Sequence, residues 1–210
     1  MIEALAGFLG KALGSFAGPV WAYFVDKFRR PDVKLKKAPR NLLDHIKPTA
    51  SPDHVRSILG PPHQISGENW AYRFADLIVQ LEFWPGSGAK SVAVGLTGRS
   101  KQERFPIPGC SKPLGVLSIA DAYEEISSIR YRNSLRHEDI LVSGRIGPPG
   151  AWQAWTFGAT RALAARALHE SYFEWDHARE HLITPPSMVL VNWVAVSSSD
   201  DEVWFDWSIG

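Results

Sequence analysis

The stretch from Ser51 to Leu96 constrains the fold more than any other part of the sequence, because it marks a helix at both ends. Ser51 can cap the helix with its hydroxyl group, and Pro52 suits the first helical position. Gly60 can take the left-handed conformation that closes a helix, and the two prolines after it forbid continuation. The sequence therefore predicts a short helix that begins at Pro52 and ends at Gly60.

Three runs of alternating apolar and polar residues follow this helix. They cover residues 70–74, 77–84 and 92–96, and a period of two is typical of strands with one buried face. The step Ala75-Asp76 is short enough to force neighbouring strands to run antiparallel, and a glycine-rich turn follows at 85–88. We therefore predict one helix on a three-stranded antiparallel meander, within a module that spans residues 49–98.

The same residues resemble a known family. The series from Asp53 to Pro62 ends in Leu-Gly-Pro-Pro, and Trp70-Ala71-Tyr72 and an alternating strand ending at Phe83 follow it. This order is similar to the SmpA/OmlA (BamE-like) family, in which a helix ending in Leu-Gly-x-Pro precedes a Trp-x-Tyr strand and a meander. The resemblance implies a non-catalytic assembly or binding module, of a kind mostly found in exported lipoproteins. The chain departs from the family in one respect, since its single cysteine is Cys110 and no lipobox cysteine lies near the start.

A diverged copy of this order is expected in the second half of the chain. Ile146-Gly147-Pro148-Pro149 followed by Trp152 repeats the succession of a glycine–proline stop and a tryptophan-rich strand. We therefore predict an α+β fold of two tandem helix-plus-meander modules, in a layout that resembles the β-lactamase inhibitor protein. Residues 99–113 are expected to form a linker, and residues 114–210 the second module.

Three elements are expected within the second module. Ser118 and the residues after it are typical of a helix start, so we predict a helix from Ser118 to about Ser128. Alanines favour a helix over residues 159–181, whereas the proposed repeat favours a strand over Leu168–Trp175, and we predict the strand. Two β-prone runs, 188–196 and 203–207, predict a terminal hairpin.

Residues 1–30 differ from the rest of the chain, because Lys11 is the only charge between Ala4 and Val25. Glycine recurs at every fourth position and forms a GxxxGxxxG face, at which two helices could meet: Gly10, Gly14 and Gly18. Trp21 lies near the end of the apolar run, where interfacial aromatic residues usually sit. We expect membrane association, with the helix either spanning the membrane or lying flat on it; a helix packed against protein is the alternative. The basic linker 31–48 would keep the bulk of the chain cytoplasmic.

One pattern is typical of metal chemistry. His177, Glu180 and His181 fit H-x-x-E-H, which on a helix places two imidazoles on one face with a carboxylate nearby. A zinc enzyme also needs a third ligand, and Thr184-Pro185-Pro186 would end any helix here. We therefore predict a solvated polar turn, with a metal-dependent hydrolase as the alternative. No catalytic residue and no cofactor are predicted.

Charge and aromatic content point to binding between proteins. The formal net charge of +1 gives no support to a nucleic-acid partner. Nine tryptophans are many for 210 residues, and exposed tryptophans often anchor protein interfaces. Four of them are our candidates for a partner-binding surface: Trp84, Trp152, Trp155 and Trp175. Core packing is the alternative for most of the tryptophans, with one or two exposed as anchors. We expect a non-enzymatic, membrane-associated binding or assembly protein; an oligomerising membrane effector, driven by the N-terminal glycine face, is a further alternative.

Overall fold

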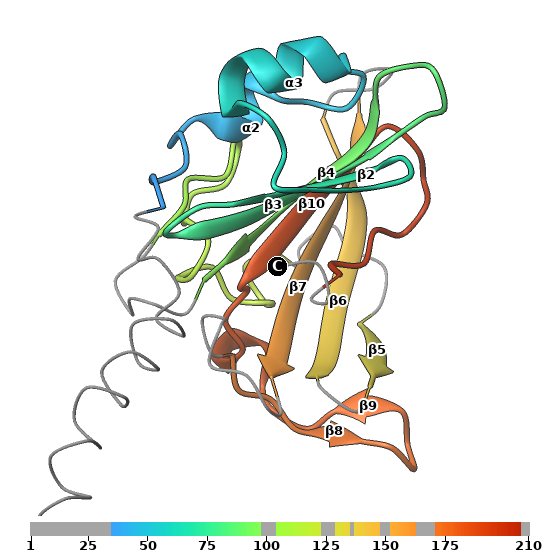
Figure 1. Ribbon diagram of the computed structural model, residues 1–210. Coiled ribbons are helices and arrows are strands. Elements are labelled where there is room, and N and C mark those ends of the chain that lie inside the picture. The colour runs from blue at the N-terminus through green and yellow to red at the C-terminus, as the bar shows by residue number, and fades with distance from the viewer. Residues whose placement is uncertain are drawn as a thin grey trace, which may run out of the picture. The chain divides into compact units, whose positions relative to one another are not determined.

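The protein is built on a large antiparallel sheet. The structure, a computed structural model, describes residues 35–97, 104–122, 129–134, 137–147, 152–162 and 171–206. Within these residues eight strands form one sheet in the order β1-β2-β3-β4-β10-β7-β6-β5 (Figure 1). Every neighbouring pair in this sheet is antiparallel. Residues 35–210 form one compact unit.

The elements have the following bounds. The first four strands are β1 (Gln64–Ser66), β2 (Asn69–Arg73), β3 (Leu77–Phe83) and β4 (Ala89–Leu96). The other half of the sheet consists of β5 (Arg130–Asn133), β6 (His137–Ile146), β7 (Gln153–Ala162) and β10 (Trp193–Ser197). A small two-stranded sheet pairs β8 (Trp175–Asp176) with β9 (His181–Leu182). The helices are α2 (Leu42–His45), α3 (Pro52–Leu59) and the 3-10 turn η1 (Pro186–Met188).

The helix and the meander predicted for the first half are confirmed. The hydroxyl of Ser51 accepts a hydrogen bond from the backbone N–H of His54 at 3.2 Å, and α3 begins at the next residue, Pro52. Gly60 ends the helix with a φ of +82°, a conformation that favours glycine. Strands β2, β3 and β4 then follow in register, with a tight turn closed between Phe74 and Leu77.

The predicted α+β fold of two tandem helix-plus-meander modules is wrong. Strand β4 pairs with β3 on one side and with β10 on the other, so strands from both predicted modules belong to one sheet. Both α-helices of the described residues, α2 and α3, precede the first strand. The physical reason is the unpaired edge that β4 would otherwise present, which β10 satisfies with a full ladder.

The proposed repeat also fails in detail. Gly60 ends a helix, whereas Gly147 directly follows β6, in the connection that leads to β7. Trp70 is a buried residue of β2, while Trp152 precedes β7 and keeps 37% of its surface exposed. A glycine followed by prolines interrupts a helix and a strand pair equally well, so the motif did not identify equivalent positions.

Three local predictions in the second half need correction. Ser118 forms an isolated β-bridge with Leu190 and residues 119–122 form turns, so no helix begins there; residues 123–128 lie outside the described part of the chain. Of the strand expected over Leu168–Trp175, residues 171–174 have no regular structure and 168–170 lie outside the described part of the chain. Residues 203–206 form no strand, so the predicted terminal hairpin is absent and β10 pairs with β4 and β7 instead.

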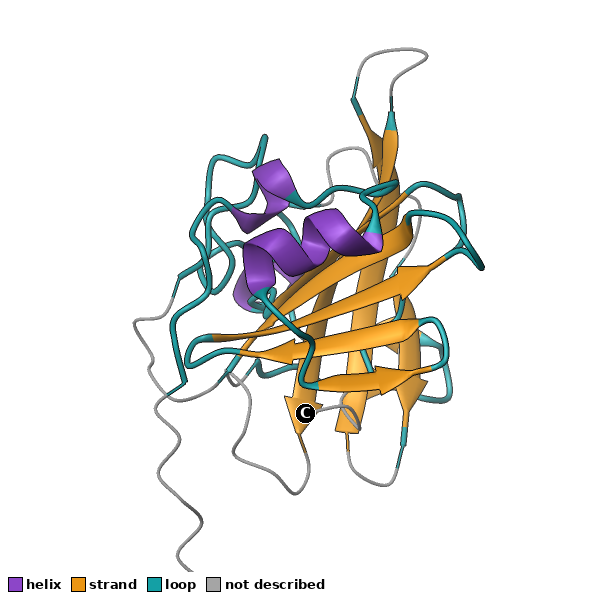
Figure 2. Cartoon of the chain, turned by 45° about the horizontal axis from the view of Figure 1, so that its top comes forward, coloured by secondary structure: helices purple, strands orange, loops and turns teal. Residues whose placement is uncertain are grey.

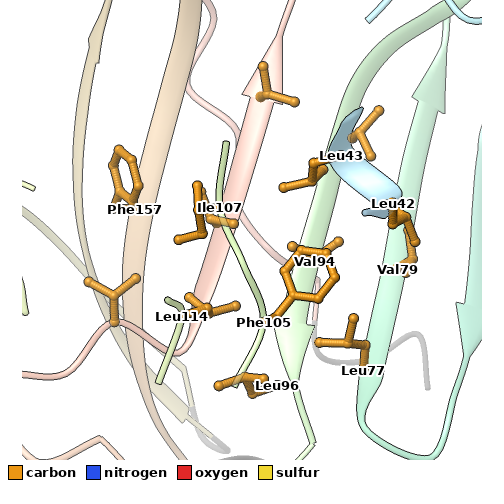
Figure 3. Close-up of a cluster of buried hydrophobic side chains, with 14 of the residues drawn as sticks. Leu42, Leu43, Leu77, Val79, Val94, Leu96, Phe105, Ile107, Leu114 and Phe157 are labelled. Carbon is orange, nitrogen blue, oxygen red and sulfur yellow. The ribbon is translucent and has the colours of Figure 1, made fainter. Parts of the chain in front are cut away.

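The main core lies on the sheet face that carries the helices, which we call the first face (Figure 2). Leu42 and Leu43 of α2 pack there with Val79 and Val94, and Phe105 of the connecting segment packs beside them (Figure 3). All five side chains are at most 4% exposed. Burial of these apolar groups, at about 25 cal/mol per Å², is the main stabilising contribution.

The opposite side of the sheet, the second face, has a smaller apolar cluster centred on Trp193. The residues directly opposite Trp193 on both neighbouring strands are glycines, Gly95 on β4 and Gly158 on β7. The indole lies so close to Gly158 that a Cβ atom there would overlap its ring. The absence of a side chain at Gly158 therefore leaves the space that the indole of Trp193 occupies, and Trp193 is fully buried.

The close approach of Gly158 and Trp193 gives a first prediction. A Gly158→Ala substitution should lower the free energy of unfolding by about 1–3 kcal/mol or more, because the methyl group overpacks the indole. In a Trp193→Phe background the smaller ring leaves room, so the same substitution should cost less. A double-mutant cycle from urea unfolding measures this coupling. An equal loss of unfolding free energy in both backgrounds would contradict the predicted coupling between Gly158 and Trp193.

Tyr72 gives a second prediction, which concerns pH. Its hydroxyl is buried without a hydrogen-bond partner among the described residues, and burial raises its pKa from 10.0 to about 12, against a smaller opposing effect of Arg56. Between these pH values the unfolded chain loses a proton that the folded chain keeps, so stability should fall as pH rises through this range.

A Tyr72→Phe variant should lose this dependence and equal or exceed wild-type stability at pH 7, because no hydrogen bond is removed. Urea unfolding at pH 7 and at several values above pH 10 checks both statements. A variant that is clearly less stable at pH 7 would show that the hydroxyl has a partner.

Candidate binding surface

The segment after β10 crosses the second face, and we call its residues 200–206 the strap. Phe205 of the strap is fully buried against Trp193, with the two ring centroids 6.0 Å apart. The side-chain amide of Gln80 bonds the main chain of Asp206 twice: it donates to the carbonyl oxygen and accepts from the N–H at 2.9 Å. Arg132 donates to the carbonyl oxygen of Phe205 at 3.2 Å. Side chains of the sheet therefore hold the strap in place of a strand ladder.

A buried polar network supports Arg132. The carboxylate of Asp139 is fully buried, and its Oδ2 lies 2.7 Å from Nη2 of Arg132 and 3.3 Å from Nε2 of His137. The hydroxyl of Thr160 donates to the other oxygen of Asp139 and accepts from the indole N–H of Trp193 at 3.0 Å. A buried carboxylate needs such partners, since an unpaired one is costly. The network joins Trp193 to the residue that bonds the strap.

Ser134, His137 and Asp139 form a hydrogen-bonded chain that the sequence analysis missed. The Ser134 hydroxyl lies 3.1 Å from Nδ1 of His137, whose Nε2 faces Asp139. A catalytic triad uses the two imidazole nitrogens the other way round, with the carboxylate on Nδ1 and the serine on Nε2. Here the hydroxyl also contacts the backbone N–H and carbonyl of His137, each at 3.1 Å. We therefore conclude that these hydrogen bonds stabilise the turn between β5 and β6 and do not form a catalytic triad.

At one end of the sheet two tryptophans remain exposed, and each lies beneath a cation. We call these four residues the rim: Trp84, Lys90, Arg145 and Trp152. Nζ of Lys90 lies 5.1 Å above the ring of Trp84, which is 43% exposed, and the guanidinium of Arg145 lies 4.1 Å above the ring of Trp152. The register from β3 through β4, β10 and β7 to β6 places both pairs at the same end.

The beginning of the strap links the two pairs of the rim. Nζ of Lys90 lies 3.4 Å from a carboxylate oxygen of Asp201, and Nη2 of Arg145 lies 2.5 Å from one of Asp200. Hydrogen bonds, first to Glu82 and then to Asp201, raise the pKa of Lys90. Two consecutive acidic residues, Asp200 and Asp201, therefore hold both cations over their tryptophans. The contacts form a continuous row across this end of the sheet, which runs Trp84, Lys90, Asp201, Asp200, Arg145, Trp152.

Two hollows flank the strap on the second face. The larger, of about 410 Å³, is lined by strap acids and by residues of β5, β6 and β7, among them Arg130, Arg145 and Thr156. The smaller, of about 180 Å³, lies on the other side and includes Gln80, Glu82 and Trp204. Both are predominantly polar in their lining, so this surface suits a polar or charged partner better than an apolar small molecule.

The four predicted partner-binding tryptophans do not form one surface. Trp84 and Trp152 both lie at the rim, each in contact with its own cation. Trp155 is a core residue, 7% exposed, with its ring stacked near that of Phe157. Trp175 of β8 is half-buried and stacks on Tyr131 with ring centroids 4.8 Å apart, at the opposite end of the sheet (Figure 1). Period-two alternation on β7 placed Trp155 on the buried face, a position that its residue type alone does not reveal.

The H-x-x-E-H pattern lies in a β-hairpin and not on a helix. His177 and Glu180 belong to the turn between β8 and β9, and His181 begins β9. The ring of His177 packs edge-on against Tyr131, whereas Nδ1 of His181 lies 4.0 Å from Asp176. Among the residues that the structure describes, no group of three or more His, Cys, Asp or Glu could hold a metal ion.

The membrane and oligomerisation residues predicted at the N-terminus cannot be placed. Gly10, Gly14, Gly18 and Trp21 lie outside the described residues. In the part of the chain that is described, no helix has the length and apolar character needed to span a membrane.

The fold and this surface define an antiparallel-sheet protein whose second face is crossed by its own C-terminal strap. Comparison with known proteins adds no relative: no protein-family model, no curated protein and no solved structure matches the chain.

Arg132 gives the third prediction. An Arg132→Met substitution should lower the free energy of unfolding by about 3 kcal/mol, because it leaves the buried Asp139 without its cation and removes a bond to the strap. Arg130→Met on the same strand is the matched control. Its ion pair with Glu202 is largely exposed on the arginine side, so the loss should stay below about 1 kcal/mol. Similar losses in both variants, measured by chemical denaturation, would contradict the assigned role.

Proposed function

We propose that this protein is a non-enzymatic binding protein that recognises a protein partner through the rim. The observation that carries the proposal is the pair of exposed tryptophans, Trp84 and Trp152, each held beneath a cation at the same end of the sheet. Tryptophan and arginine dominate the binding energy of protein interfaces, and rigidly held aromatic rings lose little entropy on binding. The ionic contacts of Asp200 and Asp201 supply that rigidity here.

The charge of the rim favours a partner with polar groups around an apolar centre. Lys90 and Arg145 alternate with Asp200 and Asp201, so the surface carries both signs within a short distance. Interfaces of this kind use an aromatic centre for affinity and a charged periphery for orientation. The metal-dependent hydrolase is the weaker candidate, because the hairpin at His177 and His181 does not place the two imidazoles on one helical face.

The proposal includes the membrane association expected for residues 1–30. Their apolar character and the basic residues that follow support attachment with the sheet on the cytoplasmic side. Cell fractionation tests this part: the full chain should sediment with membranes. Full solubility in low salt, unchanged by deletion of residues 1–30, would contradict it.

The fourth prediction tests the rim. A tagged full-length chain with Trp84→Ala and Trp152→Ala should recover a cellular partner at least about tenfold less well than wild type, since interface tryptophans often contribute 2 kcal/mol or more each. Tyr172→Ala is the matched control, because Tyr172 is also a large exposed residue, at 63%, but lies outside the rim. Quantitative cross-linking and affinity capture from native membranes provide the measurement. Equal losses in both proteins, or none in either, would refute the rim as the binding surface.

A further inference from the structure

We infer that the second face beneath the strap is a docking groove for an extended acidic–aromatic segment of a partner protein, and that the strap fills this groove in the isolated chain. The inference rests on the proposed function and names the class of partner segment. The strap supplies the template: three acidic residues, then Val203, then the aromatic pair Trp204-Phe205.

The first argument is that the groove bonds main chain as well as side chains. Gln80 bonds both the N–H and the carbonyl oxygen of Asp206, and Arg132 bonds the carbonyl oxygen of Phe205. These contacts are made with main-chain atoms of the strap, so they do not depend on the identity of its side chains. Peptide-binding proteins use the same division, in which main-chain bonds give affinity and pockets give specificity.

The second argument is that the groove offers a pocket for one aromatic residue and a support for its neighbour. Phe205 is fully buried in a niche that includes Ile78, Ala93, Leu141 and Trp193. Trp204 stands beside it under the guanidinium of Arg132, which lies 4.3 Å from the ring. A segment with two consecutive aromatic residues satisfies both positions.

The third argument is charge complementarity at the start of the groove. The three consecutive acidic residues at the start of the strap each lie against a different cation of the sheet, and the pairs are Asp200 with Arg145, Asp201 with Lys90, and Glu202 with Arg130. The three cations come from β6, β4 and β5, so their backbone positions belong to the sheet and not to the strap. An acidic partner segment would find them arranged for its own carboxylates.

The fourth argument is that the groove has room and that the strap can leave it. The hollows of about 180 and 410 Å³ on its two sides show that the strap does not fill the second face. The strap follows β10 and pairs with none of the described strands, so its release breaks no ladder among them. In each of its three ion pairs at least one side chain is more than half exposed, namely Asp201, Arg130, and both Arg145 and Asp200, and salt weakens exposed contacts of this kind.

The test uses the full-length chain and a fluorescein-labelled peptide with the sequence of residues 199–207. A Phe205→Ala variant cannot fill the niche with its own strap, so it should bind the peptide at least about tenfold tighter than wild type, in which the attached strap competes at high effective concentration. Fluorescence anisotropy measures the dissociation constants. The affinity should fall as NaCl is raised, because three ion pairs form.

Two controls make the result specific. A peptide with alanine at the place of Phe205 should bind the variant at least about tenfold more weakly, since burial of the ring is lost. Adding Gln80→Ala to the Phe205→Ala chain should also lower its affinity for the original peptide, because two hydrogen bonds to the peptide main chain disappear. If circular dichroism shows that Phe205→Ala does not fold, Asp200→Asn/Asp201→Asn loosens the strap without changing its aromatic residues and should raise peptide affinity severalfold over wild type.

The inference is overturned if a folded, loosened variant does not bind the peptide, or binds the alanine peptide equally well. Dimerisation of the wild-type chain that Phe205→Ala abolishes would assign the groove to a second copy of the chain and also overturn the partner segment. If the peptide does not bind but the Trp84→Ala/Trp152→Ala chain still captures less partner than wild type, the groove inference is wrong and the proposed function stands. Peptide binding with unchanged partner capture would instead remove the rim as the proposed binding surface.

Discussion

The pairing of β4 with β10 is the interaction on which the rest of the structure depends. It joins the meander of residues 64–96 to the strands of the second half, and five residue pairs in register connect the two strands. Both strands are buried on both faces, as expected at the centre of a sheet that is covered on its two sides. Without β10, strand β4 would expose a long apolar edge.

Strand β10 also determines what the second face can carry. It places Trp193 between two glycines, and the indole then bonds Thr160, which bonds Asp139. Asp139 in turn holds Arg132 in position to bond the strap. A continuous set of contacts therefore runs from the centre of the sheet to the segment that crosses its surface, and each member satisfies a polar group of the next.

The two faces of the sheet differ in how they are covered. The first face is covered by α2, α3 and the segment around Phe105, and its side chains form the main core. The second face is covered in part by a strap that side chains hold, with hollows on both sides and exposed tryptophans at the rim. Apart from the buried Phe205, the strap contacts the sheet mainly through side chains at the surface, and such segments open at a lower free-energy cost than the central strands.

The elements that could be predicted are those specified within a few residues. Ser51 and Gly60 determine the ends of α3 through their own hydroxyl and backbone conformation, and alternation along β2 and β3 predicts which side chains are buried. The exposed tryptophans of the rim were among the candidates because of their residue type. The charged residues that hold these tryptophans could not be predicted. Lys90 and Asp201, for example, lie far apart in the sequence and come together only through the pairing of β4 with β10.

The sequence by itself determined helix α3, its capping residues, three strands and the turns between them, because each depends on backbone preferences and short-range bonds. Only the tertiary structure decided that the two halves share one sheet, that the H-x-x-E-H residues lie in a hairpin, and that residues 200–206 cross the second face. These outcomes depend on contacts between distant segments, where the partner that completes an edge or fills a niche leaves no pattern in the local sequence.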